Sequence, residues 1–280
     1  MSIHVEVLPS RNFTDETRAA LQSRLKSFYD SVTDYSAFNE AVDQSNCWEF
    51  IGESIRQRLA LSSPGTRIRI LEVGAGRSGF GEWLRAVGLR ERVSWLAQDV
   101  TPQNAGYLSG RADAVHVGSV HDPDLRGPFD IIFSTYVLEH VTDPEQHLEA
   151  LARHRATGGS IFVFCPRYDA PGYMCPSSRH LVRSARRKLF FQVLGFRLQS
   201  LLLSKPAFLI QTDLAAFHVP FFTDADAVHW VSMHDLNLWA RRKGLSLRHL
   251  KIGHPRFPSK DWIVKRLLAC AVEIRESSGV

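Results

Sequence analysis

A buried strand that runs into a glycine-rich turn constrains the fold of this chain more than any other feature. Residues 67–73 read RIRILEV, an apolar and branched run, and residues 74–79 read GAGRSG, with the spacing G-x-G-x-x-G. Glycines are needed where a ligand approaches the backbone closely at the N-terminus of a helix, because side chains would block it. Residues 79–88 then predict a short helix. The pattern indicates an α/β fold that binds a nucleotide, although such a turn alone occurs in many α/β proteins.

Strands and helices alternate downstream of this turn. Further strands are predicted at residues 92–100, 113–120, 129–137 and 160–166. Between the last two, Asp143 and Pro144 mark the start of a helix that Gly158 and Gly159 are predicted to end. Strands that alternate with helices predict a mostly parallel sheet covered on both faces.

The alternation stops after the fifth predicted strand. Residues 167–227 are first rich in turns and then basic and apolar, and they predict a substrate-recognition insertion. Ligands of open α/β sheets bind beyond the carboxyl ends of the strands, where this insertion leaves the sheet. The alternation resumes with a helix and with a strand at residues 245–253. Residues 262–276 fit either a helix or a last antiparallel strand.

The N-terminal part of the chain has a helical pattern. Apolar residues at helical spacing predict helices around residues 21–30 and 47–61. A break at residues 62–65 then separates them from the first strand. We therefore divide the chain into an N-terminal helical lid segment, residues 1–65, and a core, residues 66–280, that contains the insertion.

Composition narrows the class of protein only moderately. The 280 residues are 44% hydrophobic and 22% charged, which excludes disordered, collagen-like and coiled-coil chains. The formal net charge of +5 is compatible with an anionic small ligand, a nucleic acid or a membrane surface. The four cysteines form no C-x-x-C pair and no apolar segment follows a charged N-terminus, so the expectation is a reduced, cytoplasmic protein.

Two carboxylates near the glycine turn indicate what it binds. Asp99 closes the second strand, 25 residues after Gly74, where an acid accepts both hydrogens of a ribose diol. The alternative is that Asp99 caps the helix that begins near Thr101. Glu72 lies two residues before Gly74, and its charge repels a pyrophosphate but attracts a cationic ligand such as S-adenosylmethionine. A dinucleotide is therefore disfavoured.

In these features the sequence resembles the class I S-adenosylmethionine-dependent methyltransferases, in their small-molecule branch. The matching segments are LEVGAGRSG at 71–79, Asp99, and FDIIFSTYVLEHV at 129–141, and the match covers about residues 66–166. The resemblance implies an α/β fold with a doubly wound, mostly parallel seven-stranded Rossmann-like sheet and helices on both faces. It also implies an N-terminal helical lid, an inserted helical cap after strand 5, and S-adenosyl-L-methionine as cofactor with S-adenosyl-L-homocysteine as product.

The resemblance further implies which residues contact the cofactor. They are Glu72, Gly74, Ala75, Gly76, Asp99, Val100, Ser119, Val120, Ser134 and Thr135. Glu72, Gly74 and Gly76 would hold the methionine end and Asp99 the ribose. Ser119 stands where the family usually has an acid facing the adenine amino group, and Asp122 follows three residues later.

Catalytic and substrate residues are less closely specified. A hydroxyl acceptor needs a base to remove its proton, whereas a neutral amine needs little help. The candidate catalytic residues are His140, Tyr136, His180 and His218, and the candidate substrate-binding residues are Tyr35, Arg167, Tyr168 and Tyr173. Tyr29 is a further candidate for the lid. No cysteine partners and no HExxH spacing accompany the histidines, so no metal site is predicted.

The sequence favours methylation of a small molecule, at oxygen slightly more than at nitrogen, such as a natural product, sugar or lipid-linked precursor. One alternative is a NAD- or flavin-dependent oxidoreductase, because Gly74, Gly76 and Gly79 satisfy the dinucleotide spacing. Another is a nucleic-acid methyltransferase, supported by RSARRK at 183–188 but not by any base-methylation motif or RNA-binding module. The fourth possible function, after these three, is a protein that binds the cofactor without catalysing a reaction.

Residues 179–210 are basic at the start and strongly apolar afterwards. The stretch is too short and too interrupted to span a membrane. It is compatible with a cover over the active site, with a subunit interface in a homodimer, and with a peripheral membrane contact. The first two are favoured over the membrane contact.

Overall fold

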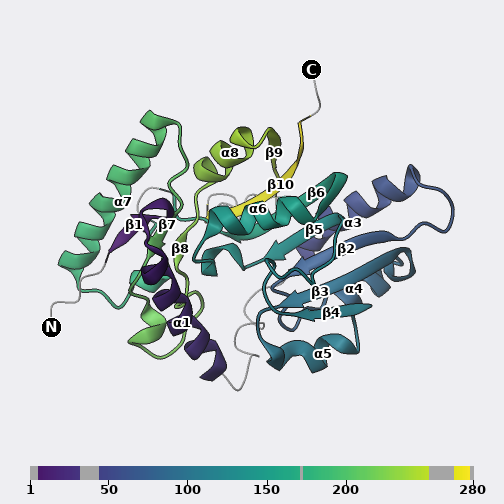
Figure 1. Cartoon of the computed structure of the whole chain (residues 1–280), viewed down its shortest axis with the longest axis horizontal. Helices are drawn as coiled ribbons and strands as arrows, with labels where there is room; N and C mark the ends of the chain where they lie inside the picture. Colours follow the sequence, from purple (N-terminus) through teal and green to yellow (C-terminus); the bar gives the residue numbers. More distant parts are fainter. Residues whose placement is uncertain (1–5, 32–43, 171–172, 252–267, 278–280) are drawn as a thin grey trace, which may run out of the picture.

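The computed structural model describes residues 6–31, 44–170, 173–251 and 268–277 (Figure 1). Its main sheet has seven strands in the order β4-β3-β2-β5-β6-β10-β9. The strands are β2 (Ile68–Val73), β3 (Val93–Asp99), β4 (Ala114–Val117), β5 (Phe129–Thr135), β6 (Arg155–Pro166), β9 (Leu245–His249) and β10 (Ala269–Glu276). All neighbours pair in parallel except β10, which is antiparallel to both β6 and β9. The predicted seven-stranded, mostly parallel sheet is confirmed.

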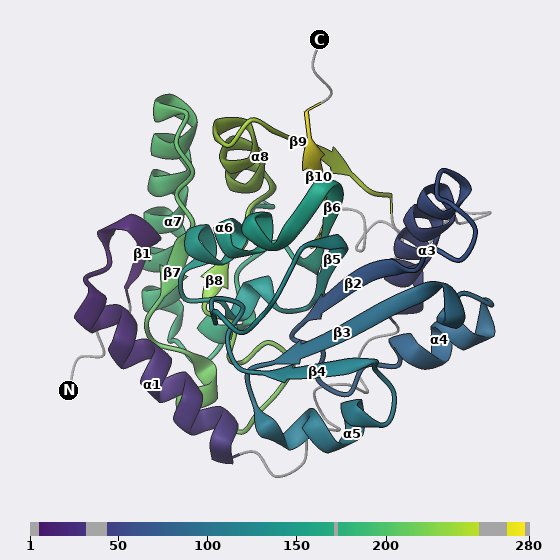
Figure 2. The same cartoon turned by 45° about the vertical axis from the view of Figure 1, so that its right-hand side comes forward.

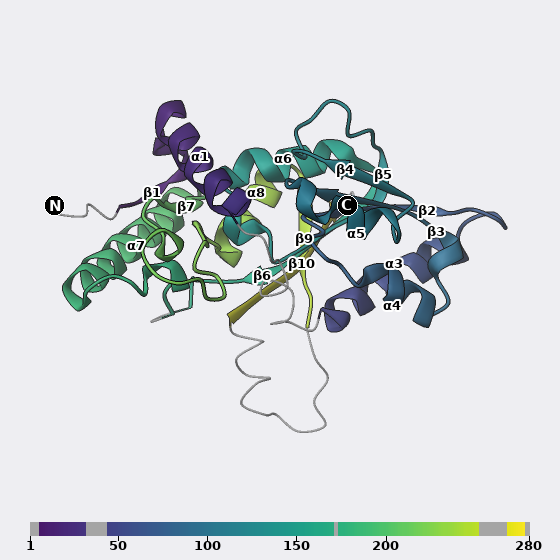
Figure 3. The same ribbon diagram turned by 90° about the horizontal axis from the view of Figure 1, so that it is seen from below.

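Helices cover both faces of this sheet (Figure 3). One face carries α3 (Ser45–Ala60), α4 (Phe80–Ala86) and α5 (Ala105–Ser109), and the other carries α6 (Pro144–His154) and α8 (Met233–Arg242). The alternation of side chains along the strands creates the two cores: Ile70 packs with the first set of helices and its neighbour Leu71 with the second. Short 3₁₀ turns are η1 (Ser10–Asn12), η2 (Arg90–Arg92), η3 (Pro102–Asn104), η4 (Leu138–His140), η5 (Pro176–Ser178) and η6 (Ala215–Phe217).

The structure shows where the helix α6 begins and ends and which element forms the C-terminal segment. α6 begins as predicted, since the Asp143 side chain accepts a hydrogen bond from the Gln146 amide at 3.2 Å. The helix ends at His154, however, and the prediction that Gly158 and Gly159 end it is wrong. β6 already pairs with β5 at Arg155, so the two glycines lie inside a strand. Residues 262–276 were predicted to form either a helix or a last antiparallel strand, and the structure has an antiparallel strand there, β10.

A second, smaller sheet was not predicted. It contains β1 (Val7–Pro9), β7 (Leu209–Gln211) and β8 (His229–Trp230), all antiparallel. The helix α1 (Asp15–Ser31) packs against one set of its residues and α7 (Arg183–Leu203) against the other (Figure 2). The N-terminal segment and the insertion after β6 therefore build one layer together, and the insertion is not purely helical.

A buried ion pair fastens α7 to this layer. The Arg197 guanidinium contacts the Asp235 carboxylate at the start of α8 and the Trp230 carbonyl oxygen. Asp235 is fully buried and also accepts hydrogen bonds from the backbone amides of Ala207 at 2.9 Å and Phe208 at 3.1 Å. Arg197 thus stands within the mostly apolar part of α7 that follows Lys188 because it neutralises a buried carboxylate.

Candidate active site

The glycine turn lies between β2 and α4, in a conformation that requires glycine. Gly74 has φ +64° and Gly76 has φ +54°, both in the left-handed region. A Cβ on Gly74 would also collide with the side chain of Val137, which follows β5. A side chain at position 74 is therefore excluded by both backbone conformation and space.

The end of β3 holds this turn in place. The amide of Gly74 donates to Gln98 Oε1 at 3.1 Å, and the amide of Gly76 donates to Asp99 Oδ2 at 2.7 Å. Asp99 Oδ1 accepts from the Thr101 amide at 2.9 Å, which is the local capping contact considered as the alternative to a ribose contact. The Ala75 amide donates to the Gln98 carbonyl at 2.9 Å. The carboxylate of Asp99 therefore joins the glycine turn to the loop after β3.

Glu72 is a buried carboxylate with an unsatisfied oxygen. Its Oε2 has no hydrogen-bond partner within the described part of the chain. Burial raises the pKa of Glu72 to about 8. A buried oxygen without a donor is costly, and a cationic group of a ligand would satisfy it. Ser134, which pairs with Val73 across the sheet, and Thr135, whose buried Oγ1 also lacks a described partner, line the neighbouring strand end.

The loop after β4 carries the residues predicted for the adenine side. The Ser119 amide donates to Asp122 Oδ2 at 2.7 Å, and Ser119 Oγ accepts from the His121 amide at 3.1 Å. Asp122 therefore folds back on its own loop. Val120 is buried, whereas Val100, beyond the end of β3, is 64% exposed. An exposed valine beside Asp99 offers an apolar surface that a flat ring would cover.

A histidine and three carboxylates gather after β5, at the end of the sheet where ligands bind. His140 Nδ1 in η4 lies 3.1 Å from Asp226 Oδ2, and the Tyr29 hydroxyl donates to the same Asp226 oxygen at 2.7 Å. Glu139 is fully buried, and neither of its carboxylate oxygens accepts a hydrogen bond from a described residue, although Oε1 lies 4.0 Å from His140 Nε2. Asp224 lies close enough to His140 for the two charges to interact. Tyr29, predicted as part of a lid, thus contacts this cluster from α1.

The charges of the cluster shift its pKa values strongly. Burial lowers the pKa of His140, but the nearby carboxylates, Asp226 before Glu139 and Asp224, together raise it by more, to about 10. Burial raises the pKa of Asp226, but the imidazolium of His140 lowers it by more, so this carboxyl stays ionised. Burial raises the pKa of Glu139 to about 8. At neutral pH the cluster therefore holds a His140–Asp226 ion pair beside a protonated Glu139.

Three of the predicted tyrosines surround this cluster. Tyr136, with φ +58°, directly follows β5, and burial raises its pKa. Tyr168 is buried, its ring stacks on that of Tyr173 at 5.6 Å between centroids, and both tyrosines interact with Asp224. Burial also raises the pKa of Asp224. The structure thus brings His140, Tyr136, Tyr168 and Tyr173 together.

Other predicted residues lie apart from this cluster or outside the described residues. The Arg167 guanidinium pairs with Asp169 at 2.5 Å. His180 and His218 both contact the Asp213 carboxylate, at 2.8 and 2.5 Å, and their rings stack at 4.8 Å. They therefore join η5 to η6, and a catalytic role for them stays a prediction. Tyr35 lies outside the described residues.

Two groups of side chains have a geometry compatible with a metal ion. They are His180, Asp213 and His218, and Glu139, His140 and Asp224; within each group the ligand atoms lie within 4.8 Å of one another. Imidazole nitrogens and carboxylate oxygens are common ligands of divalent cations. The sequence predicted no metal site because its histidines have neither cysteine partners nor HExxH spacing, and the third member of each group is at least 33 residues from the nearest of the other two.

Glu139, Asp224 and Asp226 belong to this cluster but were not predicted from the sequence. Glu139 is adjacent to His140, and this proximity was the one available signal. Asp226 lies 86 residues after His140 in a turn-rich segment, and no spacing pattern connects the two.

Comparison with known proteins agrees with this geometry. Residues 47–250 match a family described as a methyltransferase domain. The mitochondrial ubiquinone biosynthesis O-methyltransferase of Schizosaccharomyces pombe is 25% identical over 184 residues, which cover 58% of this chain and 65% of that protein. The chain thus matches slightly less than two thirds of this curated relative's length.

Solved structures share the fold at low sequence identity. An S-adenosylmethionine-dependent methyltransferase from Clostridium acetobutylicum has a TM-score of 0.51 at 10% identity, covering 92% of this chain and 99% of that one. The plantazolicin methyltransferase BpumL, solved in complex with S-adenosylhomocysteine, has a TM-score of 0.50 at 12% identity, covering 94% and 96%. The family match spans most of the chain and includes the glycine turn, Asp99 and the segment after β5, so the oxidoreductase alternative is set aside. The chain belongs to the methyltransferase domain family and has the fold of S-adenosylmethionine-dependent methyltransferases.

Proposed function

We propose that this enzyme methylates a hydroxyl oxygen of a small molecule and that His140 is the base that takes the hydroxyl proton. The observation that carries the proposal is the 3.1 Å pair of His140 Nδ1 with the buried Asp226. A carboxylate on one ring nitrogen orients the imidazole and strengthens the other nitrogen as a base, and an amine acceptor would not need such a pair. The name of the S. pombe relative, an O-methyltransferase, supports oxygen as the acceptor.

The proposed cofactor site uses the residues around the glycine turn. Glu72, with its unsatisfied Oε2, suits the ammonium group of the methionine end, and Asp99 suits the ribose hydroxyls. The exposed Val100 and the loop at Ser119 and Val120 suit the adenine ring. S-adenosylmethionine, when bound, supplies a methyl group that the sulfonium charge activates.

The residues of the cluster then carry out the proton transfer. The bound cofactor would supply the methyl group and keep the electrons of the broken carbon–sulfur bond. The deprotonated form of His140 would take the hydroxyl proton at Nε2, which lies 4.0 Å from Glu139 Oε1. Asp226 stabilises the resulting imidazolium on the Nδ1 side, and Tyr29 keeps Asp226 in place through its 2.7 Å hydrogen bond. Alignment of the two reacting atoms and removal of water supply the rest of the acceleration.

The aromatic side chains near the cluster favour an acceptor with a flat apolar body. Tyr168 stacks on Tyr173, Tyr136 interacts like them with Asp224, and Tyr168 is almost completely buried. A phenolic hydroxyl suits this environment better than a sugar, because a sugar would leave most of its hydroxyls without partners. We therefore propose a phenolic natural product or a lipid-linked phenolic precursor as the substrate class.

Asp226→Asn is expected to move the pH profile of the reaction. His140 must lose its proton to act as a base, so kcat/KM of the wild-type enzyme should rise with pH towards 10, following the raised pKa of His140. The substitution removes the negative charge that raises this pKa, so the rise should occur about 1–3 pH units lower. The measurement is release of S-adenosylhomocysteine at a series of pH values. A profile that stays in place in this variant contradicts the assignment of His140.

The acceptor atom is tested with matched compounds. Phenols and anilines with the same ring are offered to the wild-type enzyme and to His140→Gln. The proposal predicts methylation of the phenol by the wild type and its loss in the variant. Methylation of the aniline at equal rates by both proteins would instead indicate an N-methyltransferase.

A further inference from the structure

The charge of this protein is concentrated in one helix. α7 contains Arg183, Arg186, Arg187, Lys188 and Arg197 and no acidic residue. Its formal charge of +5 equals the formal net charge of the whole 280-residue chain. The remainder of the chain is therefore neutral overall. Because Arg197 is neutralised by Asp235, attraction to an anionic partner would act mainly through the four basic residues at the start of α7.

The same helix exposes an apolar stripe. Its buried face, with Leu189 and Val193, packs on the second sheet. The opposite face carries exposed apolar side chains at spacings of three and four residues, namely Phe191, Leu194, Leu198, Leu201 and Leu202. Phe191 is 56% exposed and Leu202 86%. Seven of the eleven exposed large apolar side chains in the described part of the chain lie within residues 182–203.

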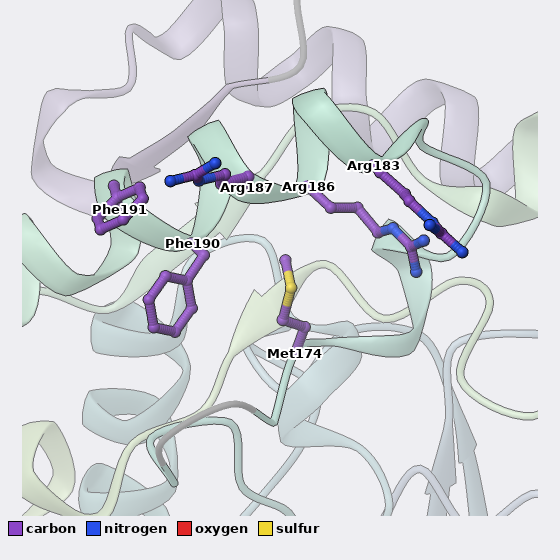
Figure 4. Close-up of a pocket in the computed structure, with 6 residues that line it drawn as sticks. All are labelled: Met174, Arg183, Arg186, Arg187, Phe190 and Phe191. Carbon is purple, nitrogen blue, oxygen red and sulfur yellow. The ribbon is translucent and has the colours of Figure 1, made fainter.

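A pocket of about 550 Å³ opens beside the basic end of α7 (Figure 4). It is lined by Met174, Arg183, Arg186, Arg187, Phe190 and Phe191. Figure 4 shows the side chains of Arg186, Phe190 and Met174 extending towards the same space below the helix. Guanidinium groups bind phosphate oxygens, and the phenylalanine and methionine offer apolar contacts next to them.

We propose that α7 lies on the surface of an anionic bilayer, with an acidic phospholipid head group in the pocket and the apolar stripe in the acyl boundary. A helix that is apolar on both faces is normally buried, and here one face has no cover within the described residues. Basic residues at one end and leucines along the outer face match a helix that lies in a membrane interface. Nowhere in the described ranges does a helix reach the length and apolarity needed to span a bilayer.

A lipid surface fits better than a nucleic acid. Proteins bind nucleic acids through basic residues that contact the phosphates and aromatic side chains that stack on the bases. A nucleic acid would leave the exposed leucines of α7 without an apolar contact. The membrane proposal uses none of the residues assigned to the cofactor or to proton transfer. Vesicle binding can therefore be tested without an acceptor, and its failure leaves the proposed methylation unaffected.

The test is sedimentation of the full chain with vesicles of phosphatidylcholine, alone or with added phosphatidylglycerol. The wild type should bind the anionic vesicles and release at high salt. Arg186→Ala with Arg187→Ala should weaken this binding about 30-fold, because each basic residue near an anionic surface contributes about fivefold. The matched control removes two exposed arginines on α3 and α4, Arg56 and Arg85, and should bind like the wild type.

The apolar stripe is tested separately. Leu198→Gln should weaken vesicle binding about tenfold, whereas Leu61→Gln should not, although Leu61 is 92% exposed. Equal binding to neutral and anionic vesicles, or none to either, overturns the proposal. So does a wild-type dimer that Leu198→Gln converts to monomer in analytical ultracentrifugation, because α7 is then a subunit interface. Binding to an RNA oligomer that exceeds vesicle binding overturns it in favour of a nucleic acid.

Discussion

His140→Gln is expected to lower turnover of a phenolic acceptor about a hundredfold to ten-thousandfold, the usual contribution of a general base. The base in the wild type is an imidazole whose Nδ1 is held 3.1 Å from the Asp226 carboxylate. Glutamine fills a similar volume but accepts no proton at neutral or alkaline pH, so the loss should be largest towards pH 10, where the wild-type imidazole becomes neutral. Affinity for S-adenosylmethionine should change little, because His140 lies outside the proposed cofactor contacts. The measurements are initial rates of S-adenosylhomocysteine release and cofactor affinity by calorimetry.

Glu139→Gln is the matched control for this prediction. Burial raises the pKa of Glu139 to about 8, so the carboxyl is mostly protonated at pH 7 and a neutral amide resembles it. Turnover at pH 7 should therefore fall by less than about tenfold. Melting temperatures of both variants identify any loss that comes from unfolding. Full activity in His140→Gln together with loss in Glu139→Gln would make Glu139 the base and refute the assignment of His140.

Asp235→Ala is expected to lower the free energy of unfolding by about 3–5 kcal/mol, the range for breaking a buried ion pair on one side. The substitution leaves the Arg197 guanidinium without its buried partner. It also removes the acceptor of the Ala207 and Phe208 amides. Urea unfolding followed by tryptophan fluorescence measures the change.

The control for Asp235 is a carboxylate in an exposed pair. Asp30 lies 2.6 Å from Lys26 on the surface of α1. Asp30→Ala should change the free energy of unfolding by less than about 1 kcal/mol, because water screens this pair and replaces its interactions. Similar changes in both variants would show that the pair between α7 and α8 does not carry the expected stability.

Local patterns were sufficient to predict the main sheet. Strands such as β2 and β5 consist of apolar runs, and the turn after β2 requires glycines that the sequence displays. The residues predicted to contact the cofactor were chosen from the same pattern, because they lie at or just after the ends of predicted strands. Helices cover both faces of the sheet, so side chains on either face are buried and most residues of these runs are apolar.

The second sheet and the residues around His140 were beyond such patterns. β1 and β7 have three residues each and β8 has two, and Val7 pairs with Gln211 across almost the whole chain. Strands this short carry no measurable periodicity. Asp226 reaches His140 because the chain leading into β8 passes η4, where the Val228 amide donates to the Glu139 carbonyl at 2.8 Å. Gly158 and Gly159 were predicted to end a helix, but pairing of β6 with its neighbouring strands places both inside a strand.

The most direct test of the cofactor site is a calorimetric titration of S-adenosylmethionine at pH 6 and pH 7, with NAD as the control ligand. Binding of the ammonium group requires an ionised Glu72, whose pKa of about 8 leaves most of the carboxyl protonated at both values. We predict one site for S-adenosylmethionine, about tenfold tighter at pH 7 than at pH 6, since the ionised fraction grows tenfold per unit below the pKa. Glu72→Gln should bind more weakly and without this pH dependence. Binding of NAD in preference to S-adenosylmethionine, or an affinity that does not change with pH in the wild type, would contradict the assignment of Glu72 and the glycine turn.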